Sequence, residues 1–163
     1  MICTTYNIRG LAGAHKRQAL RYLLASTGTQ IILLQETMIS AADAITFFLH
    51  IRPTWRVAAL DSQGLSSGIL LAWDLDIGDF HAFQTAAGLM VEGYIKGFPE
   101  KVRILNIYGP CRDRLPFWDK VTQSGTLSLE NLIIGGDLNF TLGPSEIWGG
   151  STLTDPHSAY FRH

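Results

Sequence analysis

The sequence predicts an α/β domain built on a mixed β-sheet with helices on its outer face. At the N-terminus a strand, a helix and a second strand follow one another, an order that is typical of parallel strand pairing. In the middle of the chain, strand candidates follow one another with short gaps, which favours antiparallel pairing. Several runs are apolar throughout, as expected of strands covered on both faces. The 163 residues and the 47% hydrophobic content allow one domain with a sizeable core.

Apolar runs, β-branched residues and glycine-containing gaps define the expected strands. We expect strands at residues 2–8, 30–34, 55–60, 69–73, 77–84, 89–96 and 102–108, and a last one in the apolar run at 131–136. Helical spacing of apolar residues predicts helices at 15–26, 41–51 and 112–123. In the last of these, Leu115, Trp118 and Val121 are expected on one side. Ser40 is the expected N-cap of the second helix, Gly97–Lys101 reads as a hairpin connection, and Asp155-Pro156 initiates a last short helix.

Composition excludes several classes of protein. A net charge of −1 gives no overall basic field, so any nucleic-acid binding depends on a local patch. Two cysteines, Cys3 and Cys111, are too few for a disulfide framework and indicate free thiols in a reducing compartment. We find no signal peptide, and no apolar run approaches the roughly 20 residues that span a bilayer. We therefore expect no membrane association and a location in the nucleus or cytoplasm rather than secretion.

The most informative stretch is the apolar run Leu132–Ile134, which stops at two glycines and is followed by Asp137 and Asn139. In extended geometry two residues that are two apart point to the same side. A carboxylate and an amide at a strand exit can hold a metal ion or a water molecule. The alternative is an Asx turn, in which these side chains bond only their own backbone.

Three other predicted strands also end in polar residues, at Asn7, Glu36 and Tyr108. Polar groups at the ends of several apolar strands are typical of a site at one rim of a sheet. Glu36 and Asp137 are hard oxygen ligands suited to Mg²⁺, which needs only one or two protein carboxylates. Taken singly, Asn7 reads as a turn residue, Glu36 as a solvated strand end and Tyr108 as a half-buried sheet aromatic.

Five motifs occur in order along the chain: YNIRG (6–10), LLQET (33–37), SGILLAW (67–73), NIYGP (106–110) and GGDLN (135–139). Together they resemble the endonuclease/exonuclease/phosphatase superfamily, the deoxyribonuclease-I-like fold that includes apurinic endonucleases. NIRGL and the Trp-Asp of LLAWD look most like the endonuclease-like domain of plant LINE-type retroelements. The resemblance implies an α/β fold that is the N-terminal part of a four-layer sandwich.

The resemblance also implies a role for each matching residue. Glu36 would bind the catalytic Mg²⁺ (or Mn²⁺), and Asn7 would support the metal site. Asp137 would orient or deprotonate the attacking water, and Asn139 beside it would hold the phosphate or the metal shell. Tyr108 would contribute its hydroxyl to the scissile phosphate. The implied function is Mg²⁺-dependent phosphodiester hydrolysis of DNA.

The chain departs from this pattern after GGDLN. The family continues into a second sheet and ends with an acid–histidine pair, usually Ser-Asp-His, and that string is absent here. The nearest string, Asp155-Pro156-His157, reads as a turn, and His163 lies at the terminus. We therefore expect residues 1–163 to be an incomplete, truncated domain with most of its second sheet missing. Its exposed inner sheet face would then favour self-association or a partner chain.

Basic residues follow two of the site motifs, and four of them, Arg9, Lys16, Arg112 and Arg114, are predicted to contact phosphate or DNA. The alternative is that they are solvated helix ends. Two other functions stay open. One is a catalytically dead remnant that at most binds nucleic acid or protein, which the missing acid–histidine pair favours. The other is a superfamily phosphatase acting on small phosphate esters.

Overall fold

The computed structural model describes residues 1–61, 68–141, 143–146, 155 and 158 of the chain. Eight strands are described, in the order β1 (Cys3–Asn7), β2 (Ile31–Gln35), β3 (Trp55–Leu60), β4 (Ile69–Asp74), β5 (Gly78–Gln84), β6 (Gly88–Ile95), β7 (Lys101–Tyr108) and β8 (Leu132–Asp137). The helices among them are α1 (Ala14–Ser26), α2 (Ala41–Ile51) and α3 (Arg114–Gln123), with short 3-10 turns at Thr126–Ser128 and Pro144–Glu146. None of the described helices is long and apolar enough to cross a membrane.

The strands form two four-stranded sheets, with the orders β1-β2-β4-β3 and β5-β6-β7-β8. Each sheet is mixed. In the first, β1 and β2 are parallel and the other neighbours are antiparallel. In the second, β7 and β8 are parallel and the other neighbours are antiparallel. Each parallel pair is joined by a helix, as a parallel connection requires, and this reproduces the predicted combination of parallel and antiparallel pairing.

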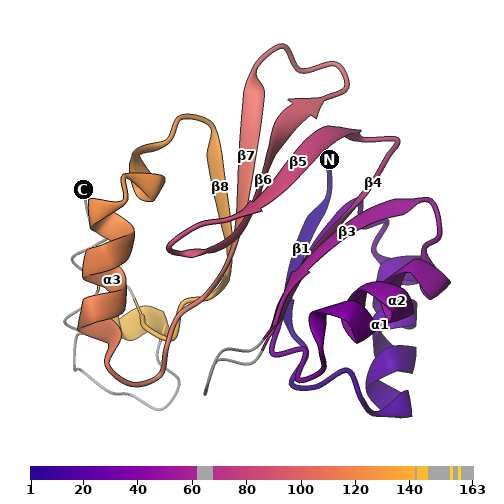
Figure 1. Ribbon diagram of the computed structural model, residues 1–163, viewed down its shortest axis with the longest axis horizontal. Coiled ribbons are helices and arrows are strands. Elements are labelled where there is room, and N and C mark those ends of the chain that lie inside the picture. The colour runs from indigo at the N-terminus through magenta and orange to yellow at the C-terminus, as the bar shows by residue number, and fades with distance from the viewer. Residues whose placement is uncertain (62–67, 142, 147–154, 156–157, 159–163) are drawn as a thin grey trace.

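Figure 1 shows the sheets face to face, with α1 and α2 outside the first sheet and α3 outside the second. Three apolar clusters fill the gaps between these layers. Leu20, Leu24 and Phe48 join the first two helices to the first sheet, and Trp118 and Val121 join α3 to the second. The predicted α/β sandwich with helices on its outer faces is therefore confirmed.

The cluster between the sheets corrects one expectation. Ile31, Leu33 and Leu71 of the first sheet pack against residues such as Val91 and Ile104 of the second. The inner face of the first sheet is covered by β5–β8 of the same chain, so the expectation that this face lies exposed was wrong. The error arose because all the closely spaced central strands were assigned to one sheet, although β5–β7 leave it to build the second. That residues 1–163 are an incomplete domain stays a prediction.

Most predicted elements lie within two residues of their observed bounds, and Ser40 does cap α2 by accepting a hydrogen bond from the Asp43 amide. One helix face was wrong. Leu115 was expected beside Trp118 and Val121, but its residue is 56% exposed while the other two are buried. At about 100° per residue, Leu115 and Val121 point well apart on the helix.

Two glycines allow close approach on β8: Gly135 lets this strand approach the first sheet, and Gly136 lets it lie against its neighbour β7. A Cβ on Gly135 would press against Leu33 and approach Thr5. A Cβ on Gly136 would collide with the Ile107 carbonyl oxygen, and Gly136 also has a φ of 142°. Close approach and positive φ both require glycine here. Together they set the position of Asp137, the next residue.

Candidate active site

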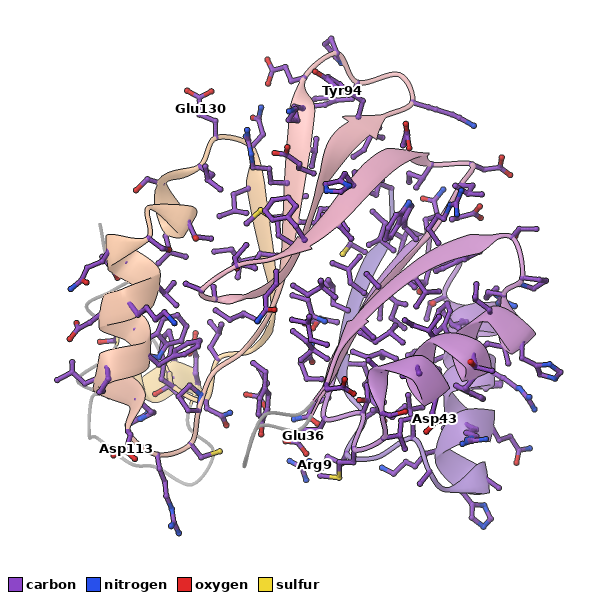
Figure 2. All side chains as sticks on the ribbon, in the orientation of Figure 1. Arg9, Glu36, Asp43, Tyr94, Asp113 and Glu130 are labelled. Carbon is purple, nitrogen blue, oxygen red and sulfur yellow. The ribbon has the colours of Figure 1, made fainter. Side chains whose placement is uncertain are left out.

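The carboxyl ends of the two parallel strand pairs meet at one end of the sandwich. Asn7 pairs with Gln35 at the end of β1 and β2, and Tyr108 pairs with Asp137 at the end of β7 and β8. Figure 2 places Glu36 and Arg9 at this end, with Asp113 after β7 at the same end, whereas Tyr94 and Glu130 lie at the opposite end. The site expected at one rim of a sheet therefore lies between the rims of two sheets.

Four of the predicted residues form a continuous set of hydrogen bonds. The Asn7 Nδ2 donates to Glu36 Oε1 at 2.9 Å and to Asp137 Oδ2 at 2.9 Å. The Tyr108 hydroxyl donates to the same Glu36 oxygen at 2.9 Å. Residues 130 positions apart, from both sheets, are thereby joined across the gap.

The turn interpretations of Asn7 and Asp137 are also correct, because each side chain closes a local turn with one atom and forms a hydrogen bond in the site with the other. Asp137 Oδ1 accepts the Asn139 amide at 3.1 Å, which is the hydrogen bond of an Asx turn, and leaves Oδ2 for Asn7. Asn7 Oδ1 accepts the Arg9 amide in the same way at 3.3 Å, and leaves Nδ2 for the carboxylates. The turn at each strand end therefore fixes the side chain that reaches into the site.

Two of these residues have left-handed backbones, with φ of 56° at Glu36 and 52° at Asn139. A non-glycine residue in this region costs on the order of 1 kcal/mol and is common at functional sites. At Glu36 this conformation ends β2. At Asn139 the chain turns so that Nδ2 donates to the Gly109 carbonyl at 2.5 Å. Asn139 was expected to point to the same side as Asp137; instead, its amide group braces the loop after β7.

The donor set fits a hard divalent cation. Glu36 and Asp137 are drawn together by one amide, and neither forms an ion pair within the described residues. Two neighbouring carboxylates repel each other, so a bound cation would relieve a cost that Asn7 offsets only in part. The described residues contain no group of three or more His, Cys, Asp or Glu that could hold a metal ion. Mg²⁺ needs only one or two carboxylates and keeps several waters.

Two further polar residues, Gln35 and Asn106, lie one step inside the rim and were not assigned a role from the sequence. Both are buried, and Gln35 Nε2 donates to Asn106 Oδ1 at 2.7 Å across the gap between the sheets. The signal was available, since Gln35 ends an apolar strand and Asn106 interrupts the apolar run from Ile104 to Ile107. An amide in such a position must find a partner, because burying it unpaired costs about 1–3 kcal/mol.

A groove of about 840 Å³ opens beside Tyr108, on the side away from β1 and β8. It runs between the ends of β3 and β4 and the turn between β5 and β6, and its other wall includes Cys111, Arg112 and Phe117. Arg112 is exposed on this wall. Arg9 is exposed at the rim and Lys16 is exposed on the first turn of α1. These three residues are open to solvent, as contact with a phosphate backbone requires.

Arg114 differs from the other three predicted DNA contacts. Its Nη1 donates to the Asn139 carbonyl at 2.8 Å and forms a 2.6 Å ion pair with Asp155, with both side chains largely buried. This pairing favours a structural role in holding the Asn139 turn. The Asp155 carbonyl accepts the Ser158 amide. Pro156, His157 and His163, and with them the expected turn, lie outside the described residues.

The model of the Endonuclease/Exonuclease/phosphatase family matches residues 4–159 of the chain. The protein belongs to this family. The match includes all five residues of the predicted site, and it agrees with the sandwich of two mixed sheets. No curated protein matches the sequence.

Solved structures share the fold at low sequence identity. An AP endonuclease from Archaeoglobus fulgidus superposes with a TM-score of 0.69 at 14% identity, over 99% of this chain and 68% of that one. A 3′ phosphatase from Neisseria, bound to a product DNA hairpin, gives 0.65 at 15% identity over 98% and 68%. The endonuclease domain of a telomere-specific non-LTR retrotransposon gives 0.61 at 17% identity over 96% and 67%. The chain thus corresponds to about two-thirds of these structures.

Proposed function

We propose that this family member hydrolyses phosphodiester bonds of DNA in a Mg²⁺-dependent reaction, with Mn²⁺ as an alternative metal, as an endonuclease of the retroelement type. The observation that carries the proposal is the pair of carboxylates, Glu36 and Asp137, held on one amide of Asn7 without a counter-ion among the described residues. The retrotransposon endonuclease and the AP endonuclease among the similar folds support DNA as the substrate.

Each residue of the rim has a role that follows from its contacts. Glu36 and Asp137, oriented by Asn7, would hold the Mg²⁺, which supplies positive charge against the charge that grows on the phosphate. Asp137 is fixed through Oδ1 and can accept a proton from an attacking water at Oδ2. The Tyr108 hydroxyl can turn from Glu36 to donate to a phosphate oxygen. The exposed Arg9 and Arg112 would contact the DNA backbone.

The expected activity is weak. The sequence contains no Ser-Asp-His string that would supply the acid–histidine pair. Loss of one such charge-stabilising group typically costs about 10²–10³ in rate. The residues proposed as base and metal ligands, which would contribute about 10²–10⁴ and several kcal/mol respectively, lie among the described residues.

The test is nicking of supercoiled plasmid by the purified chain, in Mg²⁺ and in EDTA. We expect slow nicking in Mg²⁺, none in EDTA, and a loss of at least about 10²-fold in Asp137→Ala. The matched control is Asp79→Ala, which removes an exposed carboxylate on β5 and should nick like the native chain. Equal nicking by Asp137→Ala would contradict the role of Asp137 and would point to a contaminating nuclease.

The same preparations separate the two alternatives. A folded native chain that does not nick, yet retards DNA in a gel shift, would be the catalytically dead binding module. A chain that releases phosphate from small phosphate esters but leaves plasmid intact would be the phosphatase. Location in the nucleus or cytoplasm belongs to the same proposal, and a tagged full-length protein in cells would test it.

A further inference from the structure

The buried amides of Gln35 and Asn106 form a bridge between the two sheets. Gln35 lies at the end of β2 and is 1% exposed; Asn106 lies on β7 and is 0% exposed. The Gln35 Nε2 donates to Asn106 Oδ1 at 2.7 Å and is also within 3.2 Å of Thr5 Oγ1. The Asn106 Nδ2 donates to the carbonyls of Leu34 at 3.0 Å and Leu70 at 2.8 Å.

The Asn106 side chain of the second sheet is therefore bonded to three groups of the first: the Gln35 amide and the carbonyls of Leu34 and Leu70. Leu34 and Leu70 face each other on β2 and β4, so Asn106 spans the neighbouring strands as well as the gap between the layers. The apolar contacts around it are not directional and would tolerate small sliding movements of one sheet over the other. Hydrogen bonds to fixed carbonyls allow one placement only, because they weaken steeply with distance and angle.

This bridge lies one step from the catalytic rim. Gln35 directly precedes Glu36, and Asn106 lies two residues before Tyr108 on the same strand, so their side chains project to the same face. The Tyr108–Glu36 hydrogen bond joins the same two strands one step further out. A movement of one sheet relative to the other at the bridge would directly change the separation of Tyr108 and Glu36.

We propose that Gln35 and Asn106 are a positioning pair, which sets the separation of Glu36 and Tyr108 and so assembles the site from two sheets. Its catalytic consequence rests on the proposed nuclease function, whereas its effect on the Tyr108–Glu36 contact does not. Neither residue touches the reacting atoms. A rival view is that the pair only satisfies its own buried amides.

The test is a double-mutant cycle between the bridge and the Tyr108 hydroxyl, read out by urea unfolding. Gln35→Met with Asn106→Leu removes both amides together, so that neither residue leaves a buried amide of the other without its hydrogen bond. Tyr108→Phe removes the hydroxyl. We expect Tyr108→Phe to lower the urea midpoint in the native chain and to lower it by less than half as much in the bridge variant, because the contact is already lost there. Equal shifts in both backgrounds would overturn the proposal.

The control is Val102→Ala, a buried truncation on the same strand at the far end of the sheet. It should lower stability without changing the effect of Tyr108→Phe. If the double substitution prevents folding, Gln35→Met alone replaces it in the cycle, since Asn106 then stays bonded to both carbonyls. A smaller effect of Tyr108→Phe in this variant supports the proposal. An equal effect overturns it.

A second readout uses the nicking reaction. The bridge variant should lose at least about tenfold in kcat with little change in KM, since misplacement by about 1 Å can cost 10²-fold. Val102→Ala should keep the native kcat. An unchanged kcat in the bridge variant would overturn the proposal, whereas a native chain without any nicking would overturn only the nuclease function and leave the unfolding cycle to decide.

Discussion

At the scale of single residues, the site depends on side chains that each satisfy two demands. Asn7 closes a turn with one amide atom and holds two carboxylates with the other. Asp137 closes a turn with Oδ1 and accepts the hydrogen bond of Asn7 with Oδ2. From the sequence these were competing interpretations, and nothing in a linear pattern could show that both hold. The second role depends on a partner 130 positions away.

The role of Asn7 predicts that Asn7→Asp is destabilising in a metal-dependent way. The change removes two hydrogen bonds to charged groups and sets a third carboxylate between Glu36 and Asp137. We expect a loss of about 2 kcal/mol, or about 4–8 °C in Tm for a chain of this size. Thermal unfolding in EDTA and in millimolar Mg²⁺ measures it, and Mg²⁺ should restore at least half of the loss.

Asn131→Asp is the matched control for this experiment. Asn131 also donates to a carboxylate, that of Glu100, at 2.9 Å, but it is exposed and lies at the end of the second sheet away from the rim. Its small loss of stability should not respond to Mg²⁺. If Mg²⁺ leaves the Tm of Asn7→Asp unchanged as well, Asn7 does not lie between two metal-binding carboxylates.

The two cysteines should differ sharply in reactivity. Burial raises the pKa of the Cys3 thiol from 9.0 to about 11, so only about one Cys3 in a thousand is a thiolate at pH 8. Cys111 is exposed at the groove. Iodoacetamide at pH 8, followed by mass spectrometry, should label Cys111 first and Cys3 only on unfolding. Equal rates in the folded protein would contradict this.

The same shift has a consequence for stability. Because the folded state holds the Cys3 proton more tightly than the unfolded state does, its contribution is complete below about pH 9 and is lost as the pH rises towards about 11. Cys3→Ser should flatten the fall in Tm over that range. An identical alkaline profile in Cys3→Ser would show that other groups cause the fall.

At the scale of elements, the predicted strands and helices were confirmed because their signals are local. The strand at 55–60 and the helix at 41–51 have the expected bounds, since apolar runs, β-branched residues and a capping serine decide them without help from distant residues. Leu115 was misplaced because its burial depends on where α3 docks. The direction of the Asn139 side chain was also misjudged, since its Nδ2 donates to Gly109 and its carbonyl accepts from Arg114, both distant in sequence.

The two glycines of β8 predict that Gly136→Ala destabilises the fold more than Gly135→Ala. In Gly136→Ala the new Cβ meets the rigid Ile107 backbone at a φ of 142°, whereas in Gly135→Ala it meets the movable tip of Leu33. We expect Gly136→Ala to cost about 1–3 kcal/mol, or roughly 2–12 °C in Tm, and Gly135→Ala to cost less. Thermal unfolding of the two variants measures the difference, and a larger effect of Gly135→Ala would contradict these close approaches.

At the scale of the whole molecule, the fold acts by bringing together two equivalent units. Each consists of a strand, a helix and a parallel strand, and each delivers polar residues at its carboxyl ends: Asn7 and Glu36 from one, Tyr108 and Asp137 from the other. The sequence motifs predicted these four residues. They did not predict that the units lie in different sheets, because pairing between strands distant in sequence is not encoded in a local pattern. The covered inner face and the Gln35–Asn106 bridge follow from that arrangement.

The central claim is that this junction of two sheets is a divalent cation site, and a Mn²⁺ titration followed by EPR tests it without requiring turnover. The native chain should bind Mn²⁺ and release it to Mg²⁺. Glu36→Gln and Asp137→Asn should each weaken binding at least about tenfold, while the exposed-site control Asp79→Asn should bind like the native chain. Equal Mn²⁺ affinity in the native chain and in the Glu36→Gln/Asp137→Asn double variant would contradict the account.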